Sequence, residues 1–516
     1  MLICLLRRTL YIRFRRHDNI IYRTQAIMTI ESKFGKLPLE VVNTIPTPES
    51  VFGISKLDLR SLVFRVLGPS VIAVGVAIGG GEWLLGPATA VKYGLGMAWI
   101  VVVSALLQTI YNISLTRIIM YTGEAPIVYL RRAPPGPKFW TIVIPLLLIA
   151  WGSWGLAGIA SSGATALGSV ILGRLPTAED AWLVRNLTMV IIALCVVMVL
   201  FGYKIERTLE VVNWFFAAAI LLTLLILVAP LTVKLEVILE ALRGSFNFGY
   251  IPPGADMSLI SAWWAYTGLA VGLNFIFMNW YRDKGYGMGA VVGYIPALIG
   301  GRRIALSPSG KAFVVNNDNV KTFKRWMRIL SYDQWLVFFP GALLGMYLPS
   351  VIALSLLPKG QELPAWGVAA HIANEFAAIV GKWGYYLIGF IGFIVLFSSA
   401  LGAYVDCVPR NLTDLLWTSK RVRRLARNDV RIVYYSILAA YVAFSIWAVH
   451  QAQPLILVII AANTANFVGL LVIPAIIYLS RRLPREIRPS TWEYVLLIVF
   501  LALSAFFFAS TIRAYL

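Results

Sequence analysis

Long apolar stretches recur along the whole chain, and short polar loops separate them. A helix needs about 20 mostly apolar residues to cross the roughly 30 Å of a bilayer's hydrocarbon core. Eleven stretches, numbered here span one to span eleven, meet this requirement: about residues 62–90, 95–119, 139–172, 182–202, 208–231, 257–281, 330–356, 380–405, 432–450, 453–480 and 492–513. The pattern predicts an all-α integral membrane protein with about 11 transmembrane helices. The composition agrees, because 59% of the 516 residues are hydrophobic and the mean hydropathy is +0.77.

Basic residues gather in every second loop of this pattern. The formal net charge is +21, and most lysines and arginines follow spans two, four, six, eight and ten. Cytoplasmic loops of membrane proteins are enriched in these residues. The distribution therefore predicts a cytoplasmic amino terminus and an external carboxyl terminus, and we expect the protein in the plasma membrane. The basic loops are also expected to attract anionic lipid headgroups, so the charge does not indicate a nucleic-acid partner.

The residues before span one are predicted to form a cytoplasmic tail, residues 1–60. Its first 27 residues are rich in arginine and lack the apolar core of a signal peptide. They form either a tail or an upstream extension, if translation begins at Met28. The polar, proline-containing residues 29–60 are expected to be a mobile or surface-lying leader.

Composition also limits the chemistry. Cys4, Cys195 and Cys407 lie far apart and form no CxxC pair, which indicates neither a disulfide framework nor a structural zinc site. The sequence places no HExxH motif and no serine–histidine pair at membrane depth. We therefore expect a protein that is not an enzyme and that has no cofactor apart from a transported substrate.

One stretch of span one combines two features that are unfavourable in a transmembrane helix. In "AIGGGEWLL", residues 77–85, Gly79, Gly80 and Gly81 precede Glu82. Glycine weakens a helix, and a carboxylate within a span is costly and is by default a functional-site hypothesis. Unwound backbone frees carbonyl oxygens that can bind a cation. Close packing of neighbouring helices is the alternative explanation for the glycines, and the adjoining acid makes us favour binding.

Span six contains a second candidate break. Transporters built from two inverted five-helix repeats bind substrate near the midplane, where the first helix of each repeat is broken. In "TGLAVGLN", residues 267–274, Gly268 and Gly272 precede Asn274. Spans one and six are thus interrupted at corresponding positions, and Thr267 becomes a candidate pathway residue.

These residues resemble a known family. "GPSVIAVGVAIGGGEW", residues 68–83, is similar to the first helix of the Nramp divalent-metal transporters, which begins with the same Gly-Pro pair and is broken by Asp-Pro-Gly-Asn eleven residues later. A weaker, ordered likeness continues through "YTGEAPIVYLRR", "GYKIERTLE" and a proline-bearing tenth span. The resemblance covers roughly residues 60–480. It implies a LeuT-type 5+5 inverted repeat with broken helices one and six. It also implies how the chain is divided. Residues 61–490 form the transporter core, in which 61–231 are the first repeat and 257–480 the second, and residues 491–516 form the eleventh helix and the carboxyl terminus.

The resemblance also implies a set of ligands in spans one and ten. Aligning the Gly-Pro pairs places Gly79 at the family's aspartate and Glu82 at its asparagine. A family glutamine eight residues before a proline falls on Asn466, counted back from Pro474. Gly80 is expected to add a backbone carbonyl.

The span-six ligands transfer through the family's Met-Pro-His-Asn motif. Asn274 stands at the asparagine, Val271 at the methionine, Leu273 at the histidine and Gly268 at a residue that offers only its carbonyl. We expect Asn274 to stabilise the unwound segment. A thioether favours softer metals, whereas carboxylate, amide and backbone oxygens suit Mg²⁺, Ca²⁺ or Mn²⁺. The valine therefore argues for a hard cation.

Other polar residues have two explanations each. Gly81, Val271 and Gly272 are pathway candidates beside the breaks. Asp406 could line an exit path, although an ion pair with Arg410 is the simpler explanation. Asn463 could face the pathway or bond to a neighbouring helix. For Gln108 and Asn112 in span two, which stand four residues apart, we favour bonds between helices.

Together these observations predict a secondary transporter that binds a divalent cation between spans one and six and works by alternating access. The metal ligands would be Glu82, Gly79, Gly268 and Asn466. Span three lacks the acidic residues that the resemblance leads us to expect for a proton route, which makes proton coupling through that helix doubtful. The alternative keeps the fold and replaces the metal by a small organic cation or amino acid, for which the small side chains at 79 and 271 leave room.

Overall fold

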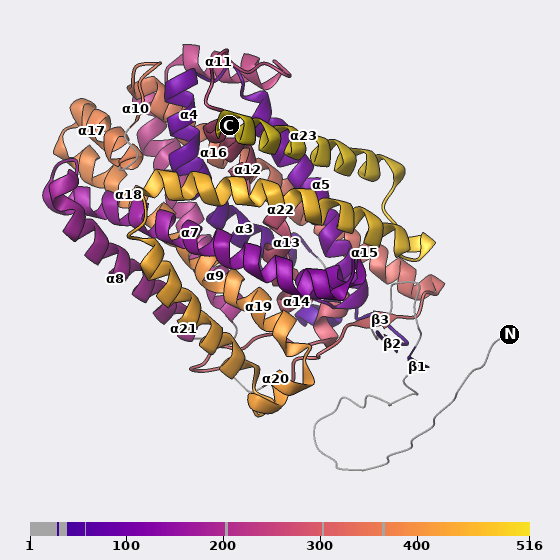
Figure 1. Ribbon diagram of the computed structural model, residues 1–516. Coiled ribbons are helices and arrows are strands. Elements are labelled where there is room, and N and C mark those ends of the chain that lie inside the picture. Colours follow the sequence, from indigo (N-terminus) through magenta and orange to yellow (C-terminus); the bar gives the residue numbers. More distant parts are fainter. Residues whose placement is uncertain are drawn as a thin grey trace.

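The computed structural model describes residues 28–29, 39–56, 58–201, 205–301, 304–363 and 367–515 (Figure 1). Within them, 11 helices are long and apolar enough to cross a membrane. They fall on the eleven predicted stretches, with ends that differ by a few residues for most of them. The all-α class is confirmed. The one addition is a small three-stranded sheet outside the helices.

Several spans consist of more than one helical segment. The first six contain, in order, α3 (Pro69–Ala77), η2 (Gly81–Leu85) and α4 (Gly86–Tyr93); α5 (Trp99–Thr122); α7 (Pro137–Leu172); α8 (Ala181–Leu200); α9 (Ile205–Leu222), η5 (Thr223–Val228) and α10 (Ala229–Thr232); α12 (Met257–Tyr266), η6 (Val271–Leu273), α13 (Asn274–Phe277) and α14 (Asn279–Lys284). The last five contain α15 (Asn317–Asp333), η8 (Gln334–Phe338) and α16 (Phe339–Leu356); α18 (Lys382–Ser399), η9 (Ala400–Asp406) and α19 (Cys407–Trp417); α21 (Val430–Ala448); α22 (Pro454–Arg482); α23 (Thr491–Tyr515).

Shorter elements connect the spans. They are β1 (Met28–Thr29), β2 (Glu40–Val42), α1 (Pro48–Phe52), α2 (Leu59–Ser61), η1 (Leu62–Val66), α6 (Pro126–Tyr129), η3 (Leu130–Arg132), η4 (Ala178–Asp180), α11 (Leu235–Ser245), η7 (Gly287–Val291), β3 (Lys311–Phe313), α17 (Val368–Val380), α20 (Lys420–Leu425) and η10 (Arg485–Ile487).

Spans one and six are both broken, as predicted. In span one, α3 starts with Pro69 in its first turn and ends at Ala77, and a turn separates it from the wide helical turn η2. In span six, Asp256 caps the start of α12 by accepting the N–H groups of Ser258 and Leu259. Helix α12 ends at Tyr266, and the next four residues are not helical. Gly268, with φ +93°, adopts a backbone conformation there that favours glycine.

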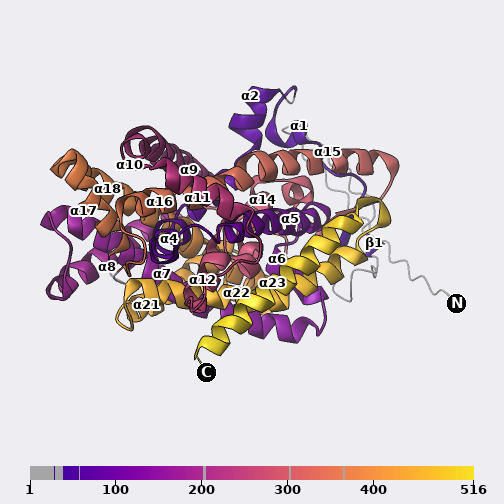
Figure 2. The ribbon, with the colours of Figure 1, turned by 90° about the horizontal axis from the view of Figure 1, so that it is seen from above.

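The broken spans lie inside the bundle. The most apolar windows of spans one and six are 100% buried, whereas those of spans four, five, nine and eleven are only 28–33% buried. Helix α7 packs against both α18 and α22, and this layer of long helices covers the broken segments α3 and α13 (Figure 1). A view along another direction shows α23, α22 and α21 on the flank opposite α9 and α10 (Figure 2). The apolar outer helices thus surround a core that contains the breaks.

Residues 39–56, called here the N-terminal arm, are packed against the bundle. Strand β2 pairs in parallel with β3 of the loop between spans six and seven, and antiparallel with β1. Ile45 of the arm is buried, and Trp326 of α15 donates its indole N–H to the carbonyl of Pro46 at 2.8 Å. Of the two states expected for residues 29–60, these residues therefore show the surface-lying one. We call the end of the bundle that carries this sheet the sheet end.

Candidate functional site

Glu82 connects the two breaks. It lies in η2, and its side chain is buried with 1% exposure. Its Oε1 accepts the N–H of Gly268 in span six at 3.1 Å, and its Oε2 accepts the N–H of Gly79 in its own span at 3.5 Å. The wide turn of η2 places the carboxylate between the two unwound segments. Sequence reasoning identified Glu82 and Gly268 but not their direct contact.

A small cavity lies beside Glu82, between spans one, three, six and eight. Its volume is about 20 Å³, which is room for about one water molecule or a bare ion. Within the part of the chain that the structure describes, Glu82 is the one Asp, Glu, Lys, Arg or His residue in the lining. The lining residues are Val76, Ala77, Gly80, Gly81, Glu82, Trp151, Tyr266, Leu269, Ala270, Phe277, Ser399, Ala403 and Tyr404.

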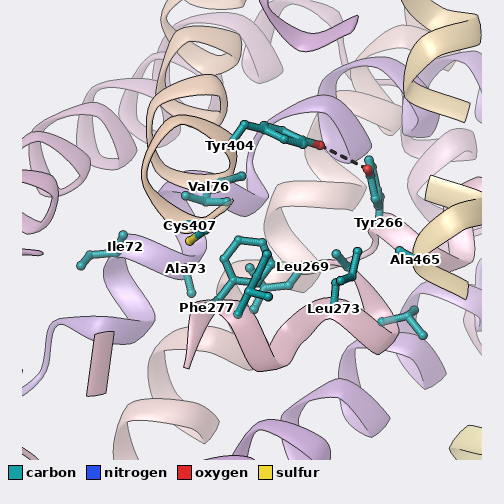
Figure 3. Packing of buried hydrophobic residues seen from close by; sticks show 14 of the residues in the cluster. Ile72, Ala73, Val76, Tyr266, Leu269, Leu273, Phe277, Tyr404, Cys407 and Ala465 are labelled. Atoms are coloured by element: carbon teal, nitrogen blue, oxygen red, sulfur yellow. Dashed lines mark hydrogen bonds between the residues drawn. The ribbon is translucent and has the colours of Figure 1, made fainter. Parts of the chain in front are cut away.

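Aromatic side chains form one wall of this cavity. The indole N–H of Trp151 donates to the hydroxyl of Tyr266 at 2.9 Å, and that hydroxyl lies 3.1 Å from the hydroxyl of Tyr404 (Figure 3). The rings of Trp151 and Tyr404 stack at 4.7 Å, and Phe277 meets Trp151 edge-on. Sequence reasoning did not select these residues, because aromatic side chains in apolar spans are usually core residues.

The glycine triplet allows span one to approach its neighbours closely. A Cβ atom at Gly79 would lie 2.4 Å from the Ser399 hydroxyl, one at Gly80 would overlap Ile159, and one at Gly81 would lie 2.4 Å from a backbone oxygen of span six. The packing explanation therefore holds at all three positions. Gly80 and Gly81 also line the cavity, so the two explanations coexist there.

Asn274 and Gln108 hold the break in span six. Asn274 Oδ1 accepts the N–H of Ala270 at 2.8 Å, while its Nδ2 donates to Gln108 at 2.9 Å and to Asn112 at 3.0 Å. Gln108 also accepts the N–H of Leu269 and donates to the carbonyl of Thr267. The contacts of Gln108 join spans two and six, as expected, but the sequence analysis did not predict that Gln108 binds the unwound segment itself. The amide side chain of Gln108 in the middle of an apolar span was the one feature of the sequence that pointed to this role.

Span-ten residues that were expected near the site lie elsewhere. Asn466 Nδ2 donates to the carbonyl and hydroxyl oxygens of Ser261 at 3.0 and 2.8 Å, and Asn466 does not line the cavity. Asn463 accepts hydrogen bonds from Ser261 and from Thr511 of span eleven. Both asparagines thus bond to the intact helix α12 and not to the break. The Oδ1 atom of Asn466 has no hydrogen-bond partner among the described residues, and its role as a ligand stays a prediction.

The remaining pathway candidates of span six face span ten. A Cβ atom at Gly272 would lie 2.0 Å from the backbone nitrogen of Gly469, so the two helices touch there. Val271, with φ +42°, also lies against Gly469 and is not in the cavity lining. The residues described contain no group of three or more His, Cys, Asp or Glu side chains suited to a metal. The alignment of Val271 with the family's methionine stays a prediction.

Asp406 belongs to a buried chain of charges at the sheet end. Arg410 pairs with Asp406 at 2.8 Å and also with Asp283, while Arg282 pairs with Asp283 and with Asp414 at 2.7 Å each. The ion pair expected between Asp406 and Arg410 is confirmed. Arg282 and Arg410 are both buried and paired, so these two residues add no exposed charge to the basic loops.

The fold resembles solved transporters, although the sequence is distant from them. No family model and no curated protein matches the chain with significance. Mhp1, a nucleobase-cation-symport-1 family transporter solved in a closed conformation with bromovinylhydantoin bound, superposes with a TM-score of 0.52 at 13% identity, over 88% of this chain and 93% of Mhp1. A manganese transporter of Eremococcus coleocola superposes with a TM-score of 0.55 at 12% identity, over 92% and 90% of the two chains. The chain has the LeuT-type fold that these structures share.

Proposed function

We propose that this protein is a secondary transporter that carries a small cation through the cavity between its broken spans, with Glu82 as the binding carboxylate. The observation that carries the proposal is the position of Glu82, buried, bonded to both breaks and next to the cavity. In transporters with broken first and sixth helices, cargo binds at this depth, and one bundle rocks against the other to open each side in turn.

The lining favours a cation as cargo. Glu82 supplies a carboxylate, no lysine, arginine or histidine of the described residues lines the cavity, and Ser399, Tyr266 and Tyr404 add hydroxyl oxygens. Oxygen ligands of this kind suit hard divalent ions, and Mg²⁺ commonly binds one or two carboxylates while it keeps several waters. The cavity volume of about 20 Å³ fits one small ion or one water, so an ion that keeps several waters requires the cavity to widen. We therefore place a hard divalent cation such as Mg²⁺ or Mn²⁺ first.

A small organic cation is the second candidate, and the aromatic wall favours it. A cation over the face of Trp or Tyr gains about 0.5–2 kcal/mol from the ring quadrupole, and Trp151, Tyr266 and Tyr404 all border the space beside Glu82. Such a cargo requires the cavity to widen. Separation of the stacked rings of Trp151 and Tyr404 would provide that space.

Calorimetric titration of the purified protein with Mg²⁺, Mn²⁺ and Cd²⁺ tests the first candidate. We expect Mg²⁺ or Mn²⁺ to bind and Glu82→Gln to lose that binding, because the substitution removes the carboxylate charge of the cavity. Asp318→Asn is the matched control, since the Asp318 side chain is 95% exposed. Binding that survives in Glu82→Gln would overturn the site. No heat with any of the three metals would direct the search to organic cations, with proteoliposome uptake as the assay.

A further inference from the structure

Asp333 is a buried carboxyl group that the proposed cation site does not use. It is the last residue of α15 in span seven and has 0% exposure. Its Oδ2 accepts the backbone N–H of Ser70 at 3.1 Å and the hydroxyl of Tyr281, while its Oδ1 has no hydrogen-bond partner. The lining of the cavity begins at Val76 in span one, so Asp333 lies apart from the cavity.

Asp333 also differs from most other buried acids of the described residues. Seven of those form salt bridges, namely Glu124 with Arg132, Asp180 with Arg174, Glu210 with Lys284, Asp283 and Asp414 with Arg282, Asp406 with Arg410, and Glu493 with Arg117. In the described part of the chain, Asp333 has no basic group within 4.0 Å. A buried carboxylate is stable when it is paired with a cation or when it binds a proton.

The surroundings of Asp333 contain few other titratable groups. They are Tyr281, Lys284 and Tyr286 at the end of span six and, beyond Lys284, Glu210 and Glu206 of α9. Lys284 Nζ is committed to Glu210 at 2.8 Å and to the carbonyl of Leu67 at 3.3 Å. Span one contributes Ser70, which does not titrate, and span seven contributes the neutral Gln334.

We propose that Asp333 is a proton-binding joint between spans one, six and seven. The site takes up one proton from water and returns it, and no other bond forms or breaks. Ionised Asp333 receives charge-assisted hydrogen bonds from Ser70 at the start of α3 and from Tyr281 in α14, and such bonds are about twice as strong as neutral ones. Protonation weakens both and frees the sheet-end segments of the two broken spans.

A line of hydrogen bonds connects this joint to the break in span six. Gln334 donates to Ser70 Oγ at 3.1 Å and to Tyr281 at 2.7 Å, and its oxygen accepts from Asn112 at 3.1 Å. Asn112 in turn accepts from Asn274, which caps the break. Span three contains no acid, so Asp333 supplies a protonatable group that the sequence analysis did not find. This role as a coupling group depends on the proposed transport, whereas proton binding itself does not.

Infrared difference spectroscopy tests proton binding without any cargo. Between about pH 5 and pH 8, around and above the usual range of a carboxyl group, we expect the carbonyl band of a protonated carboxyl to change in the purified protein. Glu82 and Asp333 are both buried and form no salt bridge among the described residues, so the comparison is made in a Glu82→Gln background. There, Asp333→Asn should lose that change, and Asp318→Asn, on the same helix but exposed, should keep it. A change that is already absent in Glu82→Gln, or that persists in the Glu82→Gln, Asp333→Asn variant, would overturn the proposal.

Thiol labelling tests whether protonation of Asp333 frees the sheet-end segments of spans one and six. Cys407 is buried beside the broken spans (Figure 3), so in a Cys4→Ser, Cys195→Ala background it reports opening of the bundle. We expect its labelling rate to change at least threefold over the same pH range, and to become independent of pH in Asp333→Asn. If Asp333→Asn fails to fold, Tyr281→Phe replaces it, because loss of one donor to the ionised carboxylate should move the midpoint of both signals toward higher pH. Unaltered pH dependence in either variant that folds would contradict the joint.

Discussion

The amide nitrogen of Asn274 donates to the amide oxygen of Gln108 at 2.9 Å, which fastens the break in span six to the middle of span two. Both side chains are completely buried. In the unwound residues of span six, the N–H groups of Gly268, Leu269 and Ala270 and the carbonyl of Thr267 bond to side chains. In a membrane, water cannot replace such partners. The two amides satisfy several of these groups at once, so the break depends on them.

Replacing Gln108 should therefore destabilise the fold. Gln108→Ala leaves the N–H of Leu269 and the carbonyl of Thr267 without their partner. A buried polar group that loses its hydrogen bond costs about 1–3 kcal/mol. We expect Gln108→Ala to have a lower thermal unfolding midpoint in detergent than the wild type. Gln451→Ala, at an exposed glutamine, is the control and should change the midpoint little. Equal midpoints for the two variants would show that Gln108 does not hold the break.

The backbones of spans one and six lie close together at Gly81, which leads to a second prediction. A Cβ atom there would lie 2.4 Å from the carbonyl oxygen of Tyr266, which is backbone and cannot rotate away. Overpacking of a core typically costs 1–3 kcal/mol, so Gly81→Ala should lower thermal stability and disturb the cavity. Gly168→Ala on α7 is the control, since its Cβ would meet only ordinary contacts at 3.7 Å or more. Wild-type stability in Gly81→Ala would mean that the two spans are not this close.

Removing an arginine from the buried chain of charges should lower the free energy of unfolding more than removing one from an exposed ion pair. Arg410→Ala removes the cation shared by Asp406 and Asp283 and leaves both carboxylates buried. Breaking a buried pair costs about 3–5 kcal/mol. Arg325→Ala removes a pair with Glu49 whose side chains are 48% and 25% exposed, and such pairs contribute about 0–1 kcal/mol. Chemical unfolding should rank the two variants in that order, and a reversed order would contradict the burial of the chain.

The sequence predicted the framework of this protein well and its site only in part. Span number, helical class and both breaks follow from local properties, namely apolar length and glycine position. Glu82 was identifiable because an acid inside a span is rare. Contacts between spans are not local, so the spacing of Asn466 from Pro474 could not show that its amide nitrogen donates to Ser261. The aromatic wall and the role of Gln108 depend on which spans become neighbours, and no single stretch encodes that.

Docking of the N-terminal arm makes a last prediction, about local order. Ile45 is 4% exposed and its N–H is bonded to Asn319 Oδ1 at 3.3 Å, so Ile45→Asp would bury an unpaired charge and should detach the arm. Hydrogen exchange at residues 39–56 should then become faster, while the amides of α22, remote from the arm, keep their protection. Glu49→Gln is the control, because it weakens only the partly exposed pair with Arg325. If Ile45→Asp leaves exchange in the arm unchanged, the arm is held by the β2–β3 pairing alone. If exchange rises across the spans as well, the arm contributes to the stability of the bundle, which its contacts with α15 would then explain.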